Sequence, residues 1–429
     1  MFSLLFYRLL TLLLLPLLLL ALLLRSFSNK QYRQRITERL GFFPKPYIKG
    51  GIVVHAASVG EVIALKPFVE QLLANYPHHA ITITTFTPTG SEQVKKLFGN
   101  RVQHSFLPLD ILPATQLFLS RLRPKLVIFM ETELWPNLIA QCHHNNIKLL
   151  LINGRLSKKS MKSYQKITSL ITPTINRFDK ILCQSGDNYE NFLKLGTDPK
   201  RCAISGNVKF DLSVNQATLE KAQQLQQLLS NNRPIWLMAS THVGDEEIAL
   251  SAFKAIKKQF PTLLLILVPR HPERFKQVER LCLTHDFTLA KRSDETQVIK
   301  QDIWLLDTLG ELMAAFSLAN IVTMGGSFSA IGGHNPLEPA LFKKAIIVGP
   351  NMSNFTEMMQ QLQQNNAIVQ LPIPNNNSQQ SQALAIEVIT LLKDQHKANL
   401  LGENAYQVVI KNQGASAQTL AEVEVLIND

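Results

Sequence analysis

The sequence lacks the residue patterns that mark several common functions. Its four cysteines (Cys142, Cys183, Cys202 and Cys282) are widely spaced, with no CxxC pair and no Cys/His cluster at zinc-ligand spacing. This pattern predicts reduced thiols in a cytosolic compartment. No GxGxxG follows the first predicted strand of either half, which argues against a dinucleotide oxidoreductase. Zinc-finger and RNP-like motifs are also absent, so nucleic acid is not an expected partner.

Acidic residues are fewer than basic ones, and the difference bears on possible partners. Lysine and arginine number 44 against 32 aspartates and glutamates, which gives a formal net charge of +12. The basic residues are spread along the chain, so an anionic membrane surface and an anionic substrate fit better than nucleic acid. One cluster stands out, and it is either part of this basic surface or an ordinary solvated helix face: Lys158, Lys159, Lys162 and Lys166.

Long apolar runs are absent after residue 24, but one occupies the amino terminus. Residues 2–24 are almost wholly apolar, interrupted by Arg8, and their length is near the about 20 residues that a helix needs to cross a bilayer. More basic residues follow this run than precede it, which places the main body in the cytoplasm. We therefore expect residues 1–26 to be an uncleaved single-pass transmembrane anchor and not a signal peptide. The following basic residues are Arg25, Lys30, Arg33, Arg35 and Arg39.

From Gly51 onward, short β-branched runs alternate with helical patterns, which is typical of parallel sheets covered on both faces. At 429 residues the chain exceeds one ordinary core. We predict the α/β class, with two doubly wound Rossmann-like domains that face each other across a cleft. The predicted strands are 51–55, 80–85, 125–130, 148–153, 180–184 and 201–205 in the first half, and 235–239, 262–268, 303–306, 321–324 and 345–348 in the second. Residues 374–380 are expected to be a flexible loop.

The predicted boundaries follow from where strand character stops and resumes. Residues 1–26 form the anchor, 27–212 the N-terminal domain, and 213–232 a linker helix rich in Gln, Asn and Leu. Residues 233–405 form the C-terminal domain, and 406–429 a final helix that packs back on the first domain.

Polar motifs follow the predicted strands, and ligands of open α/β sheets bind outside the carboxyl ends of the strands. In HAASVGEV (55–62), Ser58 and Glu61 have the spacing of a capping box around Gly60. Glu61 is therefore either a helix cap or a general base held ionised at a helix N-terminus. Two carboxylates in ETELWPN (131–137) are hard to justify by packing beside a core. Arg155 of NGRLS (153–157) could pair with one of these acids, bind an anionic substrate, or form a structural ion pair.

The second half carries groups suited to a phosphate. In GGSFSAIGGHNPLEPA (325–340), glycines would let backbone N–H groups approach a phosphate, and Glu338 could accept hydrogen bonds from both hydroxyls of a ribose. The alternative is a tight connection with Glu338 in a first helical turn. Arg270 of VPRHPER offers a guanidinium fork, and Thr308 to Glu311 again have capping-box spacing. A base in one half and a nucleotide site in the other indicate group transfer from an activated donor to a hydroxyl.

Together, HAASVGE, ETELWPN, NGRLS, GNVKFD, VPRHPER and GGSFSAIGGHNPLEPA resemble the motifs of the 3-deoxy-D-manno-octulosonic acid (Kdo) transferases of Gram-negative bacteria. The resemblance runs in order over nearly the whole chain and includes the apolar amino terminus. It implies the two-domain GT-B glycosyltransferase fold. It also implies transfer of Kdo from CMP-Kdo, a donor substrate and not a cofactor, to the lipid A precursor (lipid IVA) at the cytoplasmic face of the inner membrane. Anionic inner-membrane lipids are then expected partners, and the oligomeric state stays open.

The resemblance also implies roles for residues at matching positions. Glu61 would be the proton acceptor, and Glu131 and Lys209 (of GNVKFD) would stabilise the transition state. No metal is expected, because a CMP leaving group carries one phosphate and the chain lacks the Asp-x-Asp sequence of metal-dependent sugar transferases. The expected donor contacts are Pro269, Arg270, Leu309, Gly310, Glu311, Gly326, Ser327, Asn335, Pro336, Leu337 and Glu338, and the expected acceptor-side residues are Ser58, Gly60 and Arg155.

Residues 33–47 join basic side chains to Phe42 and Phe43, which suits a surface that meets acyl chains and lipid phosphates. The basic residues concerned are Arg33, Arg35, Arg39 and Lys45. Two other functions fit parts of the pattern. One is a GT-B enzyme that uses a UDP-sugar on a cell-envelope lipid, and the other is a non-catalytic, membrane-anchored nucleotide sensor.

Overall fold

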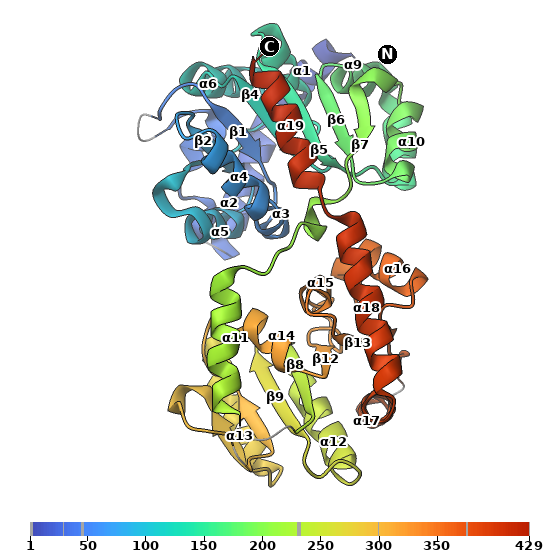
Figure 1. The fold of residues 1–429 in the computed structure, drawn as a ribbon. Helices are drawn as coiled ribbons and strands as arrows, with labels where there is room; N and C mark the ends of the chain where they lie inside the picture. Colours follow the sequence, from blue (N-terminus) through green and yellow to red (C-terminus); the bar gives the residue numbers. More distant parts are fainter. Residues whose placement is uncertain are drawn as a thin grey trace. The chain divides into compact units, whose positions relative to one another are not determined.

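The computed structural model describes residues 3–28, 30–43, 47–229, 233–298, 300–374 and 376–428. The chain forms two compact units. Unit 1 contains Met1–Asp211 and Asn412–Asp429, and unit 2 contains Leu212–Lys411. Each unit is built on one seven-stranded sheet with helices on both faces (Figure 1). The chain thus passes from unit 1 to unit 2 after Asp211 and returns after Lys411, whereas the sequence placed these boundaries at residues 212 and 405.

The parallel sheet of unit 1 has the strand order β3-β2-β1-β4-β5-β6-β7. Its central strands are apolar on both faces: Ile52 and Val54 belong to one hydrophobic cluster, and Val53 belongs to the cluster on the other side. Both faces are buried, which explains the continuous apolar runs in the sequence. The strands are β1 (Ile52–His55), β2 (Ile81–Thr85), β3 (Gln103–Phe106), β4 (Leu126–Met130), β5 (Lys148–Gly154), β6 (Lys180–Cys183) and β7 (Cys202–Ile204).

Helices cover both faces of this sheet. One face packs against α3 (Val59–Ala64), α4 (Lys66–Asn75), α5 (Pro88–Phe98) and the C-terminal α19 (Ala415–Asn428). The other face packs against α6 (Leu112–Leu122), α7 (Pro136–His144), α9 (Thr168–Ile175) and α10 (Gly186–Lys194), with α8 (Lys158–Tyr164) following β5. Asp211 fastens the start of α19, because its carboxylate accepts the N–H groups of Gly414 at 2.7 Å and Ser416 at 2.5 Å.

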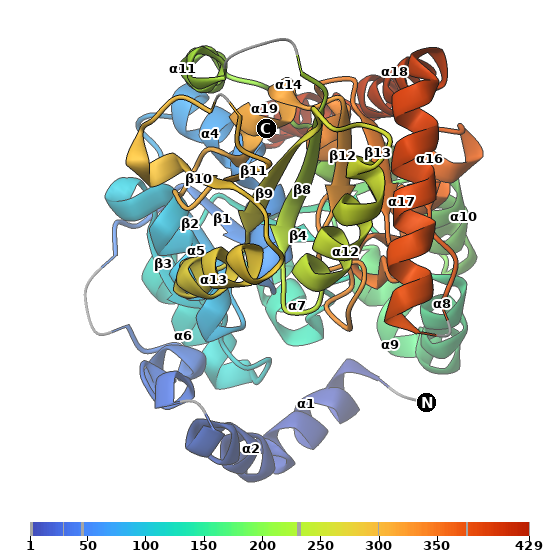
Figure 2. The same ribbon diagram turned by 90° about the horizontal axis from the view of Figure 1, so that it is seen from below.

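Unit 2 repeats the plan with the strand order β10-β11-β9-β8-β12-β13-β14. Its helices α12 (Asp245–Lys257), α13 (Phe275–Thr284) and α17 (Asn377–Lys393) share a core with the strands. Figure 2 shows α12 and α13 in front of the strands β8 and β9. The remaining helices are α11 (Gln216–Leu228), α14 (Leu312–Leu318), α15 (Leu337–Ala340), α16 (Thr356–Gln364) and α18 (Gln395–Asn412). The strands are β8 (Ile235–Thr241), β9 (Leu264–Pro269), β10 (Leu289–Lys291), β11 (Ile303–Leu305), β12 (Ile321–Met324), β13 (Ala345–Val348) and β14 (Val369–Gln370).

The amino terminus differs from the predicted single helix. It forms two helices, α1 (Leu4–Leu13) and α2 (Leu15–Ser28), and these are bent by 51° relative to each other (Figure 2). Pro16 explains the break, because proline fits the first turn of a helix but not its interior. Within the described ranges, no single helix is long and apolar enough to cross a membrane, and only this bent pair meets the criterion together.

The α1–α2 pair contacts the rest of unit 1 through an apolar cluster and through polar side chains of α1, including Arg8, whose Nε donates a 3.3 Å hydrogen bond to Asn137. Leu22 of α2 is buried in a small cluster with Leu109, Ile111 and Ala114. The Tyr7 hydroxyl of α1 donates a 2.9 Å hydrogen bond to Asp110, which is itself buried. Other leucines of both helices face outward, for example with exposed fractions of 61% at Leu9 and 76% at Leu13.

The stretch expected to be a flexible loop is partly helical. Asn376 accepts the N–H of Gln379 through its side chain and begins α17, so the prediction for residues 377–380 was wrong. Asn375 lies outside the described residues. The polar composition of this stretch reflects a helix start, where side chains of this kind satisfy free N–H groups.

Candidate functional site

Glu61 lies at the start of α3, directly beyond the carboxyl end of β1. Its Oε1 accepts a 2.8 Å hydrogen bond from the Ser58 hydroxyl, and its Oε2 accepts a 2.9 Å bond from the Ala57 N–H. Ser58 is the helix N-cap, so the predicted cap exists. Burial raises the pKa of Glu61, nearby carboxylates (Glu131 and Glu133) add to the shift, and the two hydrogen bonds oppose it. A carboxylate of raised pKa held in one orientation can accept a proton near neutral pH.

Glu131 and Lys209 meet at the same edge of the sheet. Glu131 follows β4, and Lys209 lies in a short 3-10 turn (Val208–Phe210) after β7. The Lys209 Nζ is 3.0 Å from Glu131 Oε1, with side chains only 29% and 19% exposed. Glu131 has φ of +61°, a left-handed conformation that costs free energy in a non-glycine residue and is often found at functional sites.

Glu133 contacts two side chains: Trp135 of its own ETELWPN motif, and His55, which the sequence motifs did not connect to it. The Trp135 indole donates a 2.8 Å hydrogen bond to Glu133 Oε2, and His55 Nε2 lies 3.4 Å from the same oxygen. Burial acts to raise the pKa of Glu133, but the contacts with His55 and Trp135 outweigh it and lower this pKa. Glu133 therefore stays ionised beside Glu61, whose own pKa it helps to raise. The sequence feature that could have indicated the contact between His55 and Glu133 is the position of His55 at the end of a predicted strand.

The NGRLS motif positions a neighbouring loop. The Asn153 Oδ1 accepts the N–H of Val208 at 3.1 Å, which orients the turn that carries Lys209. Asn153 also has positive φ, at +51°. The backbone carbonyl of Arg155 accepts a hydrogen bond from the Thr132 hydroxyl, so the loops after β4 and β5 are joined. The Arg155 side chain is exposed, and its pairing with an acid or a substrate stays a prediction.

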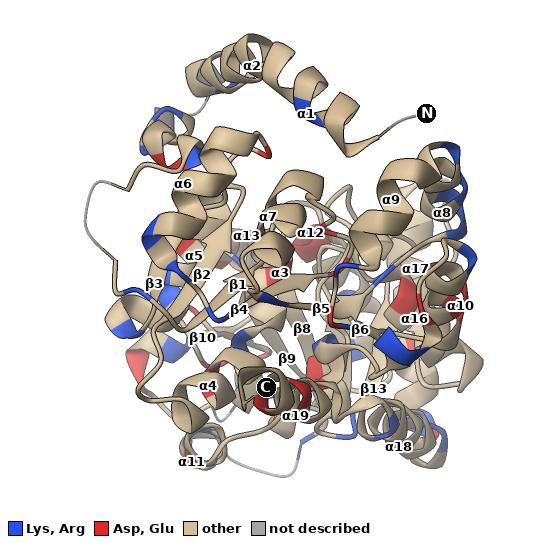
Figure 3. Cartoon of the chain, turned by 90° about the horizontal axis from the view of Figure 1, so that it is seen from above, with Lys and Arg blue, Asp and Glu red and all other residues tan. Residues whose placement is uncertain are grey.

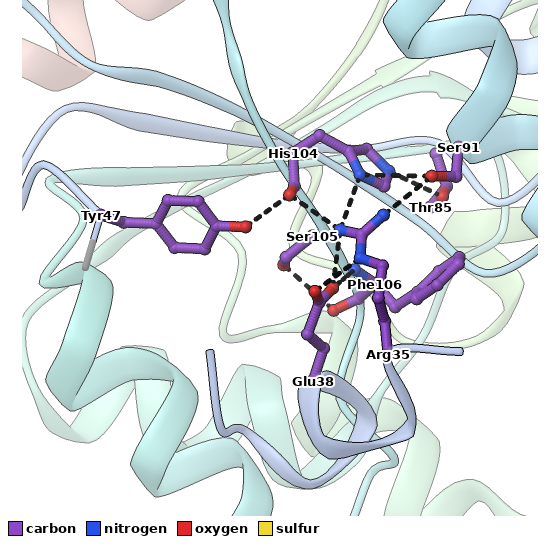
Figure 4. A network of polar contacts seen from close by, with 8 residues as sticks. All are labelled: Arg35, Glu38, Tyr47, Thr85, Ser91, His104, Ser105 and Phe106. Atoms are coloured by element: carbon purple, nitrogen blue, oxygen red, sulfur yellow. Dashed lines mark hydrogen bonds and ion pairs between the residues drawn. The ribbon is translucent and has the colours of Figure 1, made fainter. Parts of the chain in front are cut away.

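The predicted basic surface over residues 33–47 is wrong for two of its arginines. Arg35 is the centre of the polar network in Figure 4, where its guanidinium donates to Glu38 at 2.6 and 2.8 Å and to the backbone carbonyl of His104 at 3.0 Å. Arg39 is buried, with its guanidinium over the rings of Phe86 and Phe106. Arg39 is therefore not available to a lipid surface, and Arg35, which is 34% exposed, is hydrogen-bonded within the protein.

Other members of this predicted surface differ from one another. Arg33 and Phe42 are exposed, whereas Phe43 is partly buried in the core. Lys45 lies outside the described residues. Basic side chains are instead exposed along α8, where Lys158, Lys159 and Lys162 gather (Figure 3).

In unit 2, the glycine-rich loop after β12 lies directly against β8. A Cβ at Gly325 would lie 2.6 Å from the carbonyl oxygen of Ser240, so only glycine permits this close approach. The Gly326 N–H donates to Asp245 at 2.6 Å, and the Ser327 hydroxyl accepts the N–H of Gly349 at 2.7 Å. The Gly326 N–H and the Ser327 hydroxyl are thus hydrogen-bonded within the protein. Their direct contact with the donor substrate stays a prediction.

Glu338 lies in the first turn of α15, next to Asn335. The Asn335 amide approaches Glu338 Oε1 at 3.4 Å, and its Oδ1 accepts the N–H of Leu337 at 3.1 Å. Burial raises the pKa of Glu338 to about 7, although Asn335 and the positive charge of Arg270 lower it. Arg270 follows Pro269 at the end of β9 and is exposed. The motifs VPRHPER and HNPLEPA therefore meet in the structure.

The turn from Thr308 to Glu311 does not form the expected capping box. The helix α14 begins at Leu312, so Glu311 occupies the N-cap and not the third helical position. The Glu311 side chain is buried, accepts a hydrogen bond from the Thr308 hydroxyl, and lies 3.1 Å from Arg292 Nε. Leu309 is 71% exposed and Gly310 has φ of +81°, so the tip of this turn is open.

A cavity of about 520 Å³ in unit 2 is distinct from the donor site that the motifs predict. Residues such as Arg233, Asn320 and Lys344 line it, and they lie at the amino ends of the strands. The motifs lie at the opposite, carboxyl ends, where the ligands of open α/β sheets bind.

The structure also places together residues to which the sequence motifs assigned no role of their own. His242, which follows β8, contacts His334 of the glycine-rich loop, with 2.8 Å between their Nε2 atoms. Asp245 in the first turn of α12 is buried and accepts the N–H of His242 at 2.8 Å. Burial raises the pKa of Asp245 to about 7, against the effect of its hydrogen bonds from Gly326 and His242. Motif order alone gave no sign that these loops touch.

The sequence is similar to those of known proteins over nearly its whole length. A family profile described as "3-Deoxy-D-manno-octulosonic-acid transferase (kdotransferase)" matches residues 34–212. A Haemophilus influenzae protein named 3-deoxy-D-manno-octulosonic acid transferase is 41% identical over 426 residues, which cover 97% of this chain and 96% of that protein.

Two solved structures show the same fold at low sequence identity. A glycosyltransferase from Rickettsia africae has a TM-score of 0.53 at 16% identity, over 89% of this chain and 98% of that chain. A UDP-GlcNAc 2-epimerase from Neisseria meningitidis bound to UDP-GlcNAc has a TM-score of 0.56 at 16% identity, over 89% of this chain and all (100%) of that chain. The likeness concerns the fold alone, and it confirms the α/β class with two parallel sheets of the GT-B kind.

Proposed function

The chain belongs to the 3-deoxy-D-manno-octulosonic acid (Kdo) transferase family and is a glycosyltransferase of lipopolysaccharide biosynthesis, and on this basis we propose its donor, acceptor and catalytic base. The donor is CMP-Kdo, the acceptor is the lipid A precursor lipid IVA, and the base is Glu61. The observation that carries the proposal is the arrangement at the sheet edge of unit 1. There, a partly buried carboxylate of raised pKa lies beside an ion pair, Glu131–Lys209.

In the proposed reaction, Glu61 takes the proton of an acceptor hydroxyl as that oxygen attacks the anomeric carbon of Kdo. The bond from this carbon to the phosphate oxygen breaks, its electron pair stays on CMP, and the sugar inverts in a single displacement. Lys209, held by Glu131, supplies fixed positive charge for the transition state. The Ser58 hydroxyl and Ala57 N–H keep the base in one orientation throughout.

The donor groups lie in unit 2. The exposed guanidinium of Arg270 matches the single phosphate of a CMP-sugar, so the proposal needs no metal to balance a diphosphate. Glu338, fixed by Asn335, can accept the two ribose hydroxyls when ionised. The open turn Leu309–Gly310–Glu311 contributes further contacts to the nucleotide.

We further propose that the α1–α2 pair attaches the enzyme to the cytoplasmic face of the inner membrane. Helices of 10 and 14 residues are each shorter than the about 20 needed to span a bilayer, yet together they present many outward-facing leucines. Exposed lysines of α8 are suited to anionic lipid head groups. Membrane fractionation of the full chain, with and without residues 1–28, tests this attachment.

The decisive experiment is incubation of membranes that contain the enzyme with CMP-Kdo and lipid IVA, followed by mass spectrometry of the lipid. We expect addition of Kdo, and we expect it to persist in the presence of a chelator. A chelator-sensitive reaction would contradict the metal-free proposal. Transfer of a sugar from a UDP-sugar in place of CMP-Kdo would favour the alternative GT-B enzyme. Membership in an enzyme family argues against the non-catalytic sensor.

A further inference from the structure

Three histidines lie at the carboxyl ends of three adjacent strands in unit 2. His242 follows β8, His271 follows β9, and His334 lies in the loop between β12 and α15. The sheet order places β9, β8 and β12 side by side, so the three loops share one edge. Among the described residues, these histidines are not part of any group arranged to hold a metal ion. Their clustering therefore calls for another explanation.

The imidazoles are in direct contact. The Nε2 atoms of His242 and His334 are 2.8 Å apart, and their ring centroids are 5.0 Å apart with an interplanar angle of 8°. The ring of His271 meets that of His242 edge-on, at 5.2 Å and 76°. An N–H···N bond of this length carries one proton between the two Nε2 atoms. The His242–His334 pair can take one more proton, on the remaining free Nδ1, without breaking this bond.

The surroundings are rich in positive charge and keep the pair neutral without a ligand. Burial is the largest cause that lowers the pKa of His334 to about 4, and the charges of His242, Arg270 and His271 contribute to the same shift. Burial also lowers the pKa of His242, followed by His271, Arg274 and Arg270. The charged and titratable groups that face the pair are Arg270, His271 and Arg274 after β9, Asp245 on α12, and Glu338 on α15, which interacts with Arg270.

The nearby acids do not cancel this positive charge. Glu246 forms an ion pair with Arg274, whose guanidinium donates to both carboxylate oxygens at 2.7 and 3.0 Å. Asp245 and Glu338 both have a pKa raised to about 7, so each is partly protonated at neutral pH. Arg270 is exposed beside the three rings. The cluster thus offers positive charge and N–H donors to an incoming anion.

We propose that His242, His271 and His334 form, with Arg270, the binding site for anionic oxygens of the sugar-nucleotide donor, and that the His242–His334 pair takes up about one proton when the anion binds. This inference rests on the proposed function and deepens it. The anion is the phosphodiester or the sugar carboxylate, because CMP-Kdo carries both. The added proton supplies a second positive charge beside Arg270 when the electron pair of the broken bond arrives on the phosphate oxygen.

The test is calorimetric titration of the full-length chain with the methyl diester of CMP, in two buffers of different ionisation enthalpy at pH 7. A diester has no second ionisation, so any proton counted comes from the protein. We expect net proton uptake, which is below the about one proton taken up by the pair because Glu338 releases part of a proton when it ionises to bind the ribose. The affinity should fall with pH between about 6 and 8, because proton binding and anion binding are linked. His242→Gln and His334→Gln should still bind, more weakly, but lose the uptake and this fall of affinity with pH.

A matched control is His396→Gln, which removes an exposed histidine of α18 in the same unit and should change neither quantity. Titration with CMP-Kdo distinguishes the two sources of the anion. Uptake with the diester assigns the site to the phosphate, and uptake with CMP-Kdo alone assigns it to the sugar carboxylate. Binding of both ligands without proton uptake, or uptake unchanged in both variants, would overturn this inference and leave the proposed donor intact. Failure of both ligands to bind would overturn the inference and the proposed donor together.

Discussion

The substitution Glu61→Gln separates the base from the helix cap. Glutamine keeps the length of the side chain, and its carbonyl can still accept the Ala57 N–H, now 2.9 Å from Glu61 Oε2. Its amide can donate to the Ser58 hydroxyl oxygen, which lies 2.8 Å from Oε1. The exchange therefore preserves both contacts at a net cost of no more than about 1 kcal/mol. It removes only the ability to take a proton.

The two roles predict effects of very different size. Loss of a general base lowers turnover by about 10²–10⁴-fold, which corresponds to about 3–5 kcal/mol in the barrier. The folded protein raises the pKa of Glu61, so keeping this group ionised costs folding free energy once the pH exceeds its ordinary value of 4.5. We therefore expect Glu61→Gln to unfold at a temperature no lower than that of the wild type at pH 7, even though it has lost most of its turnover.

The assay is steady-state Kdo transfer together with thermal unfolding, with Ser58→Ala as the control. Ser58→Ala removes the N-cap, costs about 0.5–2 kcal/mol of stability, and keeps the carboxylate, so turnover should fall only a few-fold. Wild-type turnover should rise with pH as Glu61 ionises, and this rise should vanish in Glu61→Gln. If Glu61→Gln lowers turnover no more than Ser58→Ala does, Glu61 is a cap and the proposed base is wrong.

Three further predictions concern other ionisable groups. Lys209→Met removes the ammonium that lies 3.0 Å from Glu131 and should lower kcat by about 10²–10³-fold with KM nearly unchanged. Lys209→Arg should recover part of the lost kcat. Equal kcat in wild type and Lys209→Met would refute the assigned role. Glu246→Gln leaves Arg274 without its buried ionised partner and should lower the free energy of unfolding in denaturant by about 3–5 kcal/mol. The control is Glu70→Gln in the exposed pair with Arg101, which should cost less than about 1 kcal/mol. Similar losses at both sites would contradict the burial argument. The folded protein raises the pKa of Glu338 to about 7, so the stability that protonated Glu338 contributes to the wild type is lost as the pH rises from about 4.5 to 7. The melting temperature of Glu338→Gln relative to the wild type should therefore increase over this interval. A constant difference in melting temperature would count against the raised pKa.

Most of the fold was predictable because central parallel strands are buried on both faces and leave continuous apolar runs, as in residues 126–130. Three of the four edge strands, β3, β10 and β14, were missed for the same reason, whereas the edge strand β7 was predicted at residues 201–205. β3 has the sequence Gln-His-Ser-Phe, with its first two side chains only partly buried, and β14 has two residues, so neither has an apolar signature. The amino terminus forms two helices and not the predicted single one, because the apolar composition hid the effect of Pro16.

The candidate site was predictable as far as topology alone determines it. Parallel strands bring their carboxyl ends to one edge, which drew attention to the strand-end motifs of Glu61 and Glu131, whereas the role of Lys209 came from the family resemblance. Burial of a charged side chain is a property of tertiary packing, so the sequence did not distinguish the buried Arg39 from the exposed Arg33. The contact between His242 and His334 joins residues 92 positions apart, and no local pattern encodes it.

The contact between α1 and the body of unit 1 has a practical consequence for protein production. Asp110 accepts the N–H groups of Asn137 at 3.0 Å and Leu138 at 2.9 Å, at the start of the helix that follows the ETELWPN motif, and Tyr7 is its third donor. A shortened chain that begins after residue 28, designed to ease purification, would remove apolar surface but also a hydrogen bond to this buried carboxylate. Low activity of such a shortened chain would then report damage next to the ETELWPN loop, and not only the loss of a membrane.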